Sequence, residues 1–348
     1  MKKFWVVFAF LLLLSCTQTE KTTEKIKIGA ILPLTGPFGF YGEDGRIAID
    51  LALEEAGDKI DVIYEDSAGE NPKAVAAFQK LTEVDGAKIV ISSTSWISNA
   101  VYSQAADKGI LQAIIASAAF KRTRNDSRAI RLTVDVKDEA PTLVAHLKQY
   151  TRVAILYLNN DYGKGWADQL SKSLGNMVVA SEAYNPGETD VSAQLTKIKA
   201  ANPDVIVLTS TGKDGGLFAR KTREMGMTAD FVSQRPIQSP ELLQETTAVE
   251  GLVYSYPAYN AEHPFVAKYK EKYNKEPSVF AVEAYDAVIA LSKATEQCKT
   301  DTACIYQWFV NKEYDGALGH VTFDEQGDAH YPFVLKQVKD GKFVAYTP

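Results

Sequence analysis

Two series of short apolar runs, separated by amphipathic stretches, constrain the fold of this chain more than any other feature. The runs of the first series are IKIGAIL, DVIYE, KIVIS and LQAIIA, and those of the second are RVAILYL, NMVVASEAY, DVIVLTS, ADFVSQ and GLVYSY. Each is rich in β-branched residues and has the length of a buried strand. Alternation of strands with helical patterns is typical of parallel sheets in α/β domains, so the chain predicts two α/β lobes.

The stretches between these strands place apolar residues at helical spacing. Helices are expected over 42–56, 71–84 and 97–108 in the first series, and over 163–174, 191–201 and 215–225 in the second. Asn71 is expected to be a helix N-cap, because Pro72 follows it in what would be the first turn. The length of 348 residues fits two such units.

The rhythm changes after Pro257. Three helices in succession are expected over 263–274, 279–295 and 302–310, and then β-hairpins with turns at 324–327 and 339–341. Helices without strands cannot form a third α/β unit. We therefore expect them to pack on the existing sheets, so that the chain crosses between the lobes several times.

The N-terminus resembles a secretory signal. Lys2 and Lys3 precede an apolar run over 4–14, which is too short to cross a bilayer but fits the central region of a signal peptide. Leu13-Leu14-Ser15-Cys16 resembles a lipobox, which predicts a signal peptide over 1–15, a lipidated Cys16 and a polar tether over 16–25. The alternative is an ordinary signal peptide with a coincidental cysteine.

Two further cysteines, Cys298 and Cys304, lie between predicted helices. In an oxidising compartment such a pair predicts a local disulfide. Two unpaired thiols are the alternative, and a metal site is disfavoured because no histidine lies near them.

Charge and motifs argue against two classes of function. The chain has 44 acidic and 38 basic residues, a net charge of −6, which argues against nucleic acid as the main partner. It contains no GxSxG, HExxH or Walker sequence, and no GxGxxG after a strand. The sequence therefore disfavours an enzyme, and it predicts no cofactor and no metal.

Polar loops follow several predicted strands, at the end of the sheet where α/β folds bind ligands. They cover 33–42, 92–96 and 116–119. Small hydroxylated residues at a helix start leave backbone N–H groups free to hold a carboxylate. Tyr41 and Trp96 could supply apolar walls; the alternatives are a plain helix cap and packing between neighbouring loops.

The segment IKIGAILPLTGPFGFYGEDGRIAIDLALEEA resembles the opening of the leucine/isoleucine/valine-binding family of periplasmic binding proteins. The resemblance continues through DYGKGWADQL, DVSAQLTKIKAANPDVIVLTSTGKDGGLFARKTREMGM and HVTFDEQGDAHYPFVLKQVKDGKFV, and covers the chain from Ile26 to its end. It implies a type I periplasmic fold, with two Rossmann-like lobes joined by a three-crossing hinge. The lobes would comprise 26–140 with 257–329, and 141–256 with 330–348.

The resemblance also implies ligand-binding positions between the lobes. They fall on Tyr41, Ser95, Trp96, Ser117, Ala118, Tyr162 and Thr211. The family's segment that helps to hold the α-carboxylate and ammonium of an amino acid has lost its threonine here, because Ala118 or Ala119 occupies that position.

The sequence departs from the family's pattern at a second position, where the charge is reversed. The acidic residue that would pair with a ligand ammonium falls on Arg235. An arginine there would repel an ammonium and could form a bidentate pair with a carboxylate. This predicts a ligand with a carboxylate but no α-ammonium; the alternatives are an Arg235 that faces solvent or pairs with Glu241.

Together these features predict a lipid-anchored solute receptor in the periplasm or at the cell surface, which delivers a small organic molecule to an ABC permease. The same fold would also serve a sensory module that passes ligand occupancy to a separate receptor protein. An enzyme on a binding-protein fold is the third alternative.

Overall fold

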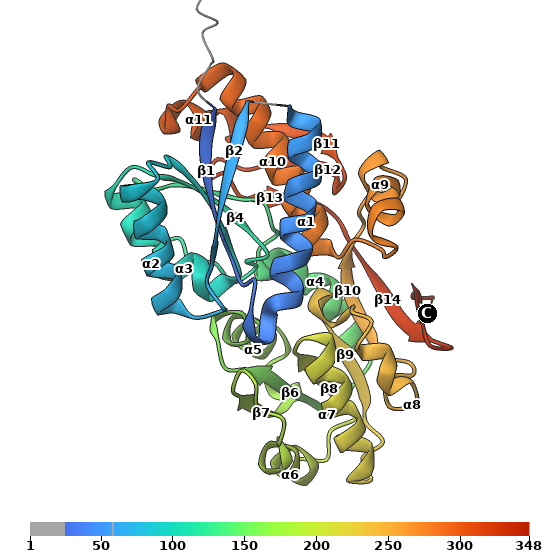
Figure 1. Ribbon diagram of the computed structural model, residues 1–348. Coiled ribbons are helices and arrows are strands. Elements are labelled where there is room, and N and C mark those ends of the chain that lie inside the picture. The colour runs from blue at the N-terminus through green and yellow to red at the C-terminus, as the bar shows by residue number, and fades with distance from the viewer. Residues whose placement is uncertain (1–24, 58, 348) are drawn as a thin grey trace, which may run out of the picture.

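The computed structural model describes residues 25–57 and 59–347. It has two lobes, one above the other in Figure 1. No helix in the described part of the chain is long and apolar enough to cross a membrane. The predicted signal peptide, the predicted lipidated Cys16 and residues 16–24 of the predicted tether lie outside the described residues.

The first lobe is built on a parallel sheet with the strand order β2-β1-β3-β4-β5. Its strands are β1 (Ile26–Leu32), β2 (Ile60–Asp66), β3 (Ile89–Ser93), β4 (Leu111–Ile115) and β5 (Arg128–Arg131). β5 is missing from the sequence prediction because its four residues begin and end with arginine. Arg131 is nevertheless buried, and its charge is met by Asp135 at 2.8 Å and Asp328 at 2.6 Å.

The second lobe is built on a mixed sheet with the order β15-β14-β10-β9-β8-β6-β7. Its parallel strands are β6 (Val153–Leu158), β7 (Val178–Tyr184), β8 (Val205–Thr209), β9 (Asp230–Ser233) and β10 (Val253–Pro257). The antiparallel strands β14 (Phe333–Lys339) and β15 (Lys342–Ala345) form the predicted C-terminal hairpin beside β10.

Helices cover both sheets. They are α1 (Gly39–Ala56), α2 (Asn71–Gln79), α3 (Ser95–Asp107), α4 (Val136–Leu147), α5 (Asp161–Leu174), α6 (Ser192–Ala200), α7 (Gly212–Glu224), α8 (Thr246–Val249), α9 (Pro264–Tyr273), α10 (Val279–Cys298) and α11 (Thr302–Phe309). α2 continues into a π-helical turn over Lys80–Val84. Its N-cap is Glu70 rather than the predicted Asn71, since Glu70 is the extended residue before the helix.

The alternation of side chains along each strand builds a core on both faces of the sheet. In β1, Ile28, Ala30 and Leu32 pack in the cluster formed by α1 and α10, whereas Ile31 packs in the cluster formed by α2 and α3. Side chains that point to opposite faces of one strand thus join two different layers of helices.

The chain crosses between the lobes three times. It crosses between β5 and α4, after β10, and again before β14. After the second crossing α10 packs on α1, and α11 packs on β4 and β5, as expected for helices without strands of their own. A small sheet of β11 (Glu313–Gly316), β12 (Gly319–Phe323) and β13 (Ala329–His330) follows.

α4 packs against α5, β10 and β14, so the first crossing lies before Val136. The predicted lobe limit at 140 falls inside this helix.

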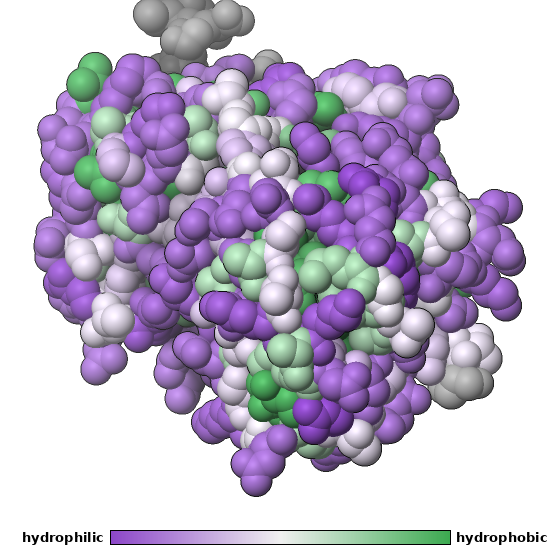
Figure 2. Space-filling view, turned by 90° about the horizontal axis from the view of Figure 1, so that it is seen from below, coloured by the Kyte–Doolittle hydropathy of each residue, from purple (hydrophilic) through white to green (hydrophobic). Residues whose placement is uncertain are grey.

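Cys298, at the end of α10, and Cys304, in α11, are joined by a disulfide with their Cα atoms 5.5 Å apart. The bond ties together two consecutive helices of the first lobe. Seen from the end of the second lobe, the surface is mainly hydrophilic, with apolar patches scattered over it (Figure 2).

Candidate functional site

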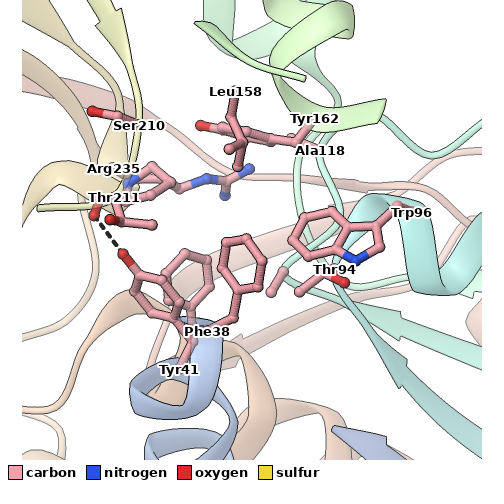
Figure 3. Close-up of a pocket in the computed structure, with 13 residues that line it drawn as sticks. Phe38, Tyr41, Thr94, Trp96, Ala118, Leu158, Tyr162, Ser210, Thr211 and Arg235 are labelled. Atoms are coloured by element: carbon pink, nitrogen blue, oxygen red, sulfur yellow. Dashed lines mark hydrogen bonds between the residues drawn. The ribbon is translucent and has the colours of Figure 1, made fainter. Parts of the chain in front are cut away.

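A cavity of about 50 Å³ lies between the lobes. Residues of both lobes line it: Phe38, Tyr41, Thr94, Trp96, Ala116, Ala118, Leu158, Tyr162, Ser210, Thr211, Arg235, Pro236 and Phe280 (Figure 3). The wall that faces the cavity consists almost wholly of carbon atoms. The cavity therefore offers an apolar surface, with polar groups set behind it.

Two Tyr-Gly pairs position a tyrosine in each lobe. A Cβ atom on Gly42 would lie 2.1 Å from the carbonyl oxygen of Pro33, and one on Gly163 would lie 1.9 Å from that of Leu158. Only glycine allows these helices to start so close to the segment that precedes them. The tight starts of α1 and α5 place Tyr41 and Tyr162 at the cavity.

The ends of β3 and β4 carry two residues in the left-handed region. Thr94 has φ 71° and Ala116 has φ 51°, and both line the cavity. Such a conformation is strained for a β-branched threonine and persists only where the surroundings hold it. Ala116 is held by Glu283, whose Oε2 accepts its N–H at 2.7 Å.

The start of α3 is not capped by a side chain. Thr94 is the N-cap residue, but its hydroxyl does not bond to the helix and has no other partner. The N–H groups of the first helical turn therefore lack a side-chain partner at the edge of the cavity. Ser117 lies in the loop after β4 and is fully buried, and its hydroxyl also has no hydrogen-bond partner.

Aromatic rings form most of the wall. Trp96 is fixed by its Nε1, which donates to the carbonyl of Gly69 at 2.8 Å, and its ring centroid lies 4.8 Å from that of Phe38. Tyr41 meets Phe280 edge to face with centroids 4.7 Å apart. Rings held in this way give a rigid slot for a compact apolar group.

Among the described residues that line the cavity, Arg235 is the one with an ionic side chain. It is 2% exposed and forms ion pairs with Glu283 at 3.0 Å and with Glu139 at 3.2 Å. Burial opposes its charge, but the two glutamates outweigh burial and raise the pKa of the guanidinium. Burial also raises the pKa of Glu139, against the attraction of Arg235. Arg235 thus neither faces solvent nor has an ion pair with Glu241.

Contacts across the cleft hold the two lobes together. The hydroxyl of Tyr41 donates to the carbonyl of Pro236 at 2.8 Å, and Nδ2 of Asn99 donates to Asp161 at 3.0 Å. The pair between Arg235 and Glu283 also joins a loop of the second lobe to a helix of the first. The structure is therefore that of a closed clamp.

The structure brings six of the eight predicted ligand-binding residues to the cavity wall: Tyr41, Trp96, Ala118, Tyr162, Thr211 and Arg235. Ser95 and Ser117 are buried beside it and do not line it. The Ser95 hydroxyl accepts the N–H of Ala119 at 3.1 Å, so it braces the neighbouring loop. Thr211 caps α7 through its own side chain, which accepts the N–H of Asp214.

Sequence reasoning missed Phe38, Leu158, Ser210, Phe280 and both glutamates of the arginine cluster. Phe38 lies in the loop after a predicted strand and Ser210 is the last residue of another, so both could have been found from that position. Phe280 and Glu283 lie in α10, far along the chain, and nothing local marks them. Across residues 25–57 and 59–347, no cluster of three or more His, Cys, Asp or Glu side chains could hold a metal ion.

Comparison with known proteins identifies the family. The family model for periplasmic binding protein matches residues 25–342. The chain belongs to this family. Within it, the chain is similar to the Leu/Ile/Val-binding protein BraC3 of Rhizobium johnstonii, with 29% identity over 92% of this chain and 93% of that protein.

Solved structures agree with this periplasmic binding protein assignment. An extracellular ligand-binding receptor from Desulfohalobium retbaense has a TM-score of 0.89 at 38% identity; the match covers 92% of this chain and 59% of that one. The chain thus spans about three fifths of that receptor's length. A leucine-binding protein, LivK, from Thermotoga maritima has a TM-score of 0.83 at 25% identity, over 92% of this chain and 98% of that one.

These relatives confirm the predicted family, the two-lobed type I fold and the expectation of a binding protein rather than an enzyme. The chain is a substrate-binding protein of the ABC type, from a family that binds small molecules and works with ABC permeases in the periplasm.

Proposed function

We propose that this periplasmic binding protein is a lipid-anchored receptor that delivers a small carboxylate without an α-amino group to an ABC permease. One observation carries the choice of ligand: among the described residues that line the cavity, Arg235 is the charged one and none is acidic. The ligand would lie between the lobes against Tyr41, Trp96, Ala118, Tyr162, Thr211 and Arg235, with Ser95 and Ser117 buried behind this wall.

The charge of the lining disfavours an ammonium. A buried ammonium needs a counter-ion, because an isolated charge loses several kcal/mol of hydration. Glu139 and Glu283 do not line the cavity, and both are paired with Arg235. A ligand ammonium would therefore meet the positive end of Arg235 rather than a free carboxylate.

The start of α3 is the natural place for the ligand carboxylate. Its first-turn N–H groups have no side-chain cap, and the hydroxyl of Thr94 is buried without a partner. Free N–H groups and the helix dipole both favour an anion there. A direct pair between Arg235 and the ligand carboxylate would have to displace one of the two glutamates.

The size of the cavity limits the rest of the ligand. About 50 Å³ between Phe38, Tyr41, Trp96 and Phe280 accommodates only a compact apolar group. The lobes would have to open to admit it, with hinge bending in the three crossing segments. We propose that the lobes comprise 26–140 with 257–329 and 141–256 with 330–348, except that α4 from Val136 onward belongs with the second lobe, because it packs on α5, β10 and β14.

A matched ligand screen tests the proposal. The chain from Thr17 is heated with leucine and with 4-methylpentanoate, which is leucine without its amine, and likewise with phenylalanine and 3-phenylpropanoate. A ligand at about 100 times its dissociation constant adds about 2.7 kcal/mol and raises the Tm by several degrees. We expect the amine-free members to stabilise the protein. Equal stabilisation by leucine would overturn the proposed ligand class.

Two tryptophan variants locate the binding. Trp96→Ala removes part of the cavity wall and should abolish the shift in Tm, whereas Trp308→Ala, which removes a half-buried ring on α11 outside this cavity, should preserve it. The lipid anchor is tested separately: Cys16→Ala should release the protein from membranes.

A further inference from the structure

Three charged residues from different parts of the chain meet beside the cavity. Arg235 follows β9, Glu139 lies in α4 and Glu283 lies in α10. Nη1 of Arg235 lies 3.0 Å from Glu283, and Nη2 lies 3.2 Å from Glu139. All three side chains are at most 1% exposed, so solvent does not screen these pairs.

The two carboxylates are held by other donors as well. Glu283 accepts the hydroxyls of Thr133 at 2.9 Å and Tyr331 at 2.8 Å, in addition to the N–H of Ala116. These donors come from the strand ends and hinge segments of the first lobe. Glu283 would therefore stay in place if the arginine side chain were absent.

Glu139 is fixed in the same way. The hydroxyl of Ser255, in β10, donates to its Oε1 at 2.6 Å, and its Oε2 has the Arg235 ion pair as its polar contact. The carboxylates therefore form a preorganised pair of anions. The cation between them is the tip of a long side chain.

The side chain of Arg235 also reaches the cavity. Arg235 belongs to the lining, and in the view of Figure 3 its guanidinium points toward the middle of the lining residues. The same side chain thus contacts the ligand space on one side and two buried carboxylates on the other. Without the arginine, both carboxylates would face an opening that continues the cavity.

We propose that Arg235 determines specificity by filling an anionic subsite with its own guanidinium, so that the amine of a competing ligand finds no carboxylate to bind. The subsite is formed by Glu139 and Glu283, and its chemistry suits an ammonium or a guanidinium. The inference rests on the proposed function, because it explains how the site rejects ligands that carry an amine. A tethered cation has a high effective concentration, so a free ammonium cannot compete with it.

The subsite is tested by deleting the arginine side chain and adding a small molecule of the same structure. Arg235→Ala leaves a space that matches ethylguanidinium. We expect 10 mM ethylguanidinium chloride to raise the Tm of this variant by about 3 °C relative to equal sodium chloride. The wild type, whose subsite is full, should show no rise.

Arg46→Ala is the matched control. Arg46 also has two acidic partners, Glu43 at 2.6 Å and Asp50 at 3.1 Å, but its side chain is 37% exposed on α1. Ethylguanidinium should not stabilise this variant. If Arg235→Ala fails to fold alone, the double variant Arg235→Ala, Glu139→Gln removes the repulsion between two unpaired carboxylates and should still show a rise, which is smaller because only Glu283 remains charged.

The result that would overturn the inference is a folded Arg235→Ala or double variant that gains no more from ethylguanidinium than Arg46→Ala does. The affinity for leucine is a second measurement: Arg235→Ala should bind leucine at least ten times more tightly than the wild type does. Rescue by ethylguanidinium does not depend on which ligand the wild type binds. Failure of the subsite is therefore distinguishable from failure of the proposed ligand class.

Discussion

Gly163 shows how one residue can position a functional side chain. Its backbone N–H donates to Oδ1 of Asn160 at 2.9 Å, and the missing Cβ lets α5 start against the carbonyl of Leu158. Gly163→Ala would bring a methyl group within 1.9 Å of that oxygen, so the backbone must shift. We expect a loss of about 2 kcal/mol in the free energy of unfolding, measured by urea denaturation, and weaker ligand binding because Tyr162 moves with the turn.

Gly45→Ala is the control for this change. Gly45 lies inside α1, where the nearest neighbour of an added methyl group is the Cβ of Ala284 at 3.9 Å, an ordinary contact. Alanine is favoured over glycine within a helix, so this variant should be as stable as the wild type or more stable by about 0.5–1 kcal/mol. If both variants lose stability equally, the close approach at Gly163 is not the cause.

At the scale of elements, the sequence predicted what local patterns determine. The alternation of apolar runs with helical patterns predicted the four strands β1–β4, the second series β6–β10 and the three late helices. It missed β5, whose four residues begin and end with arginine; the burial of Arg131 depends on Asp135 and also on Asp328, which is distant in sequence. The partners of Arg235 were missed for a similar reason. Glu139 and Glu283 are distant from Arg235 in sequence, and no local pattern encodes such long-range pairs.

The contact of α10 with the loop between β11 and β12 predicts a dependence of stability on pH. Asp286 of α10 accepts the N–H groups of Ala317 at 2.9 Å and Leu318 at 2.8 Å, and burial raises its pKa to about 6. The folded state therefore holds this proton more tightly than the unfolded state does, whose aspartate pKa is about 3.9. Stability should fall as the pH rises from about 4 to 6, by on the order of 3 kcal/mol from this group.

Asp286→Asn removes the titrating group. The variant is expected to lose a hydrogen bond to the loop and to be less stable overall, but its unfolding free energy should fall less between pH 4 and 6 than that of the wild type. Urea denaturation at several pH values compares the two slopes. Parallel curves would show that Asp286 titrates alike in the folded and unfolded states.

For the whole molecule, closure depends on a small number of contacts between the lobes, and the hydrogen bond from Tyr41 to the carbonyl of Pro236 is one of them. A net gain of about 1 kcal/mol from such a bond changes the ratio of closed to open molecules about five-fold. Tyr41→Phe keeps the ring against Phe280 and removes only the hydroxyl. We expect a larger radius of gyration for the unliganded variant in small-angle X-ray scattering, and a return to the wild-type value once ligand binds and closes the lobes.

Tyr64→Phe separates this effect from the general loss of a buried hydroxyl. The Tyr64 hydroxyl donates to Asp50 at 2.7 Å within the first lobe, so its removal should leave the balance between open and closed forms unchanged. The same two variants also distinguish closure from direct contact. A change in closure appears in the scattering of the unliganded protein, whereas lost contact with the ligand alone would lower affinity and leave that scattering as in the wild type. Identical scattering from unliganded Tyr41→Phe and wild type would mean that the ion pair between Arg235 and Glu283, together with the Asn99–Asp161 hydrogen bond, suffices to hold the lobes closed.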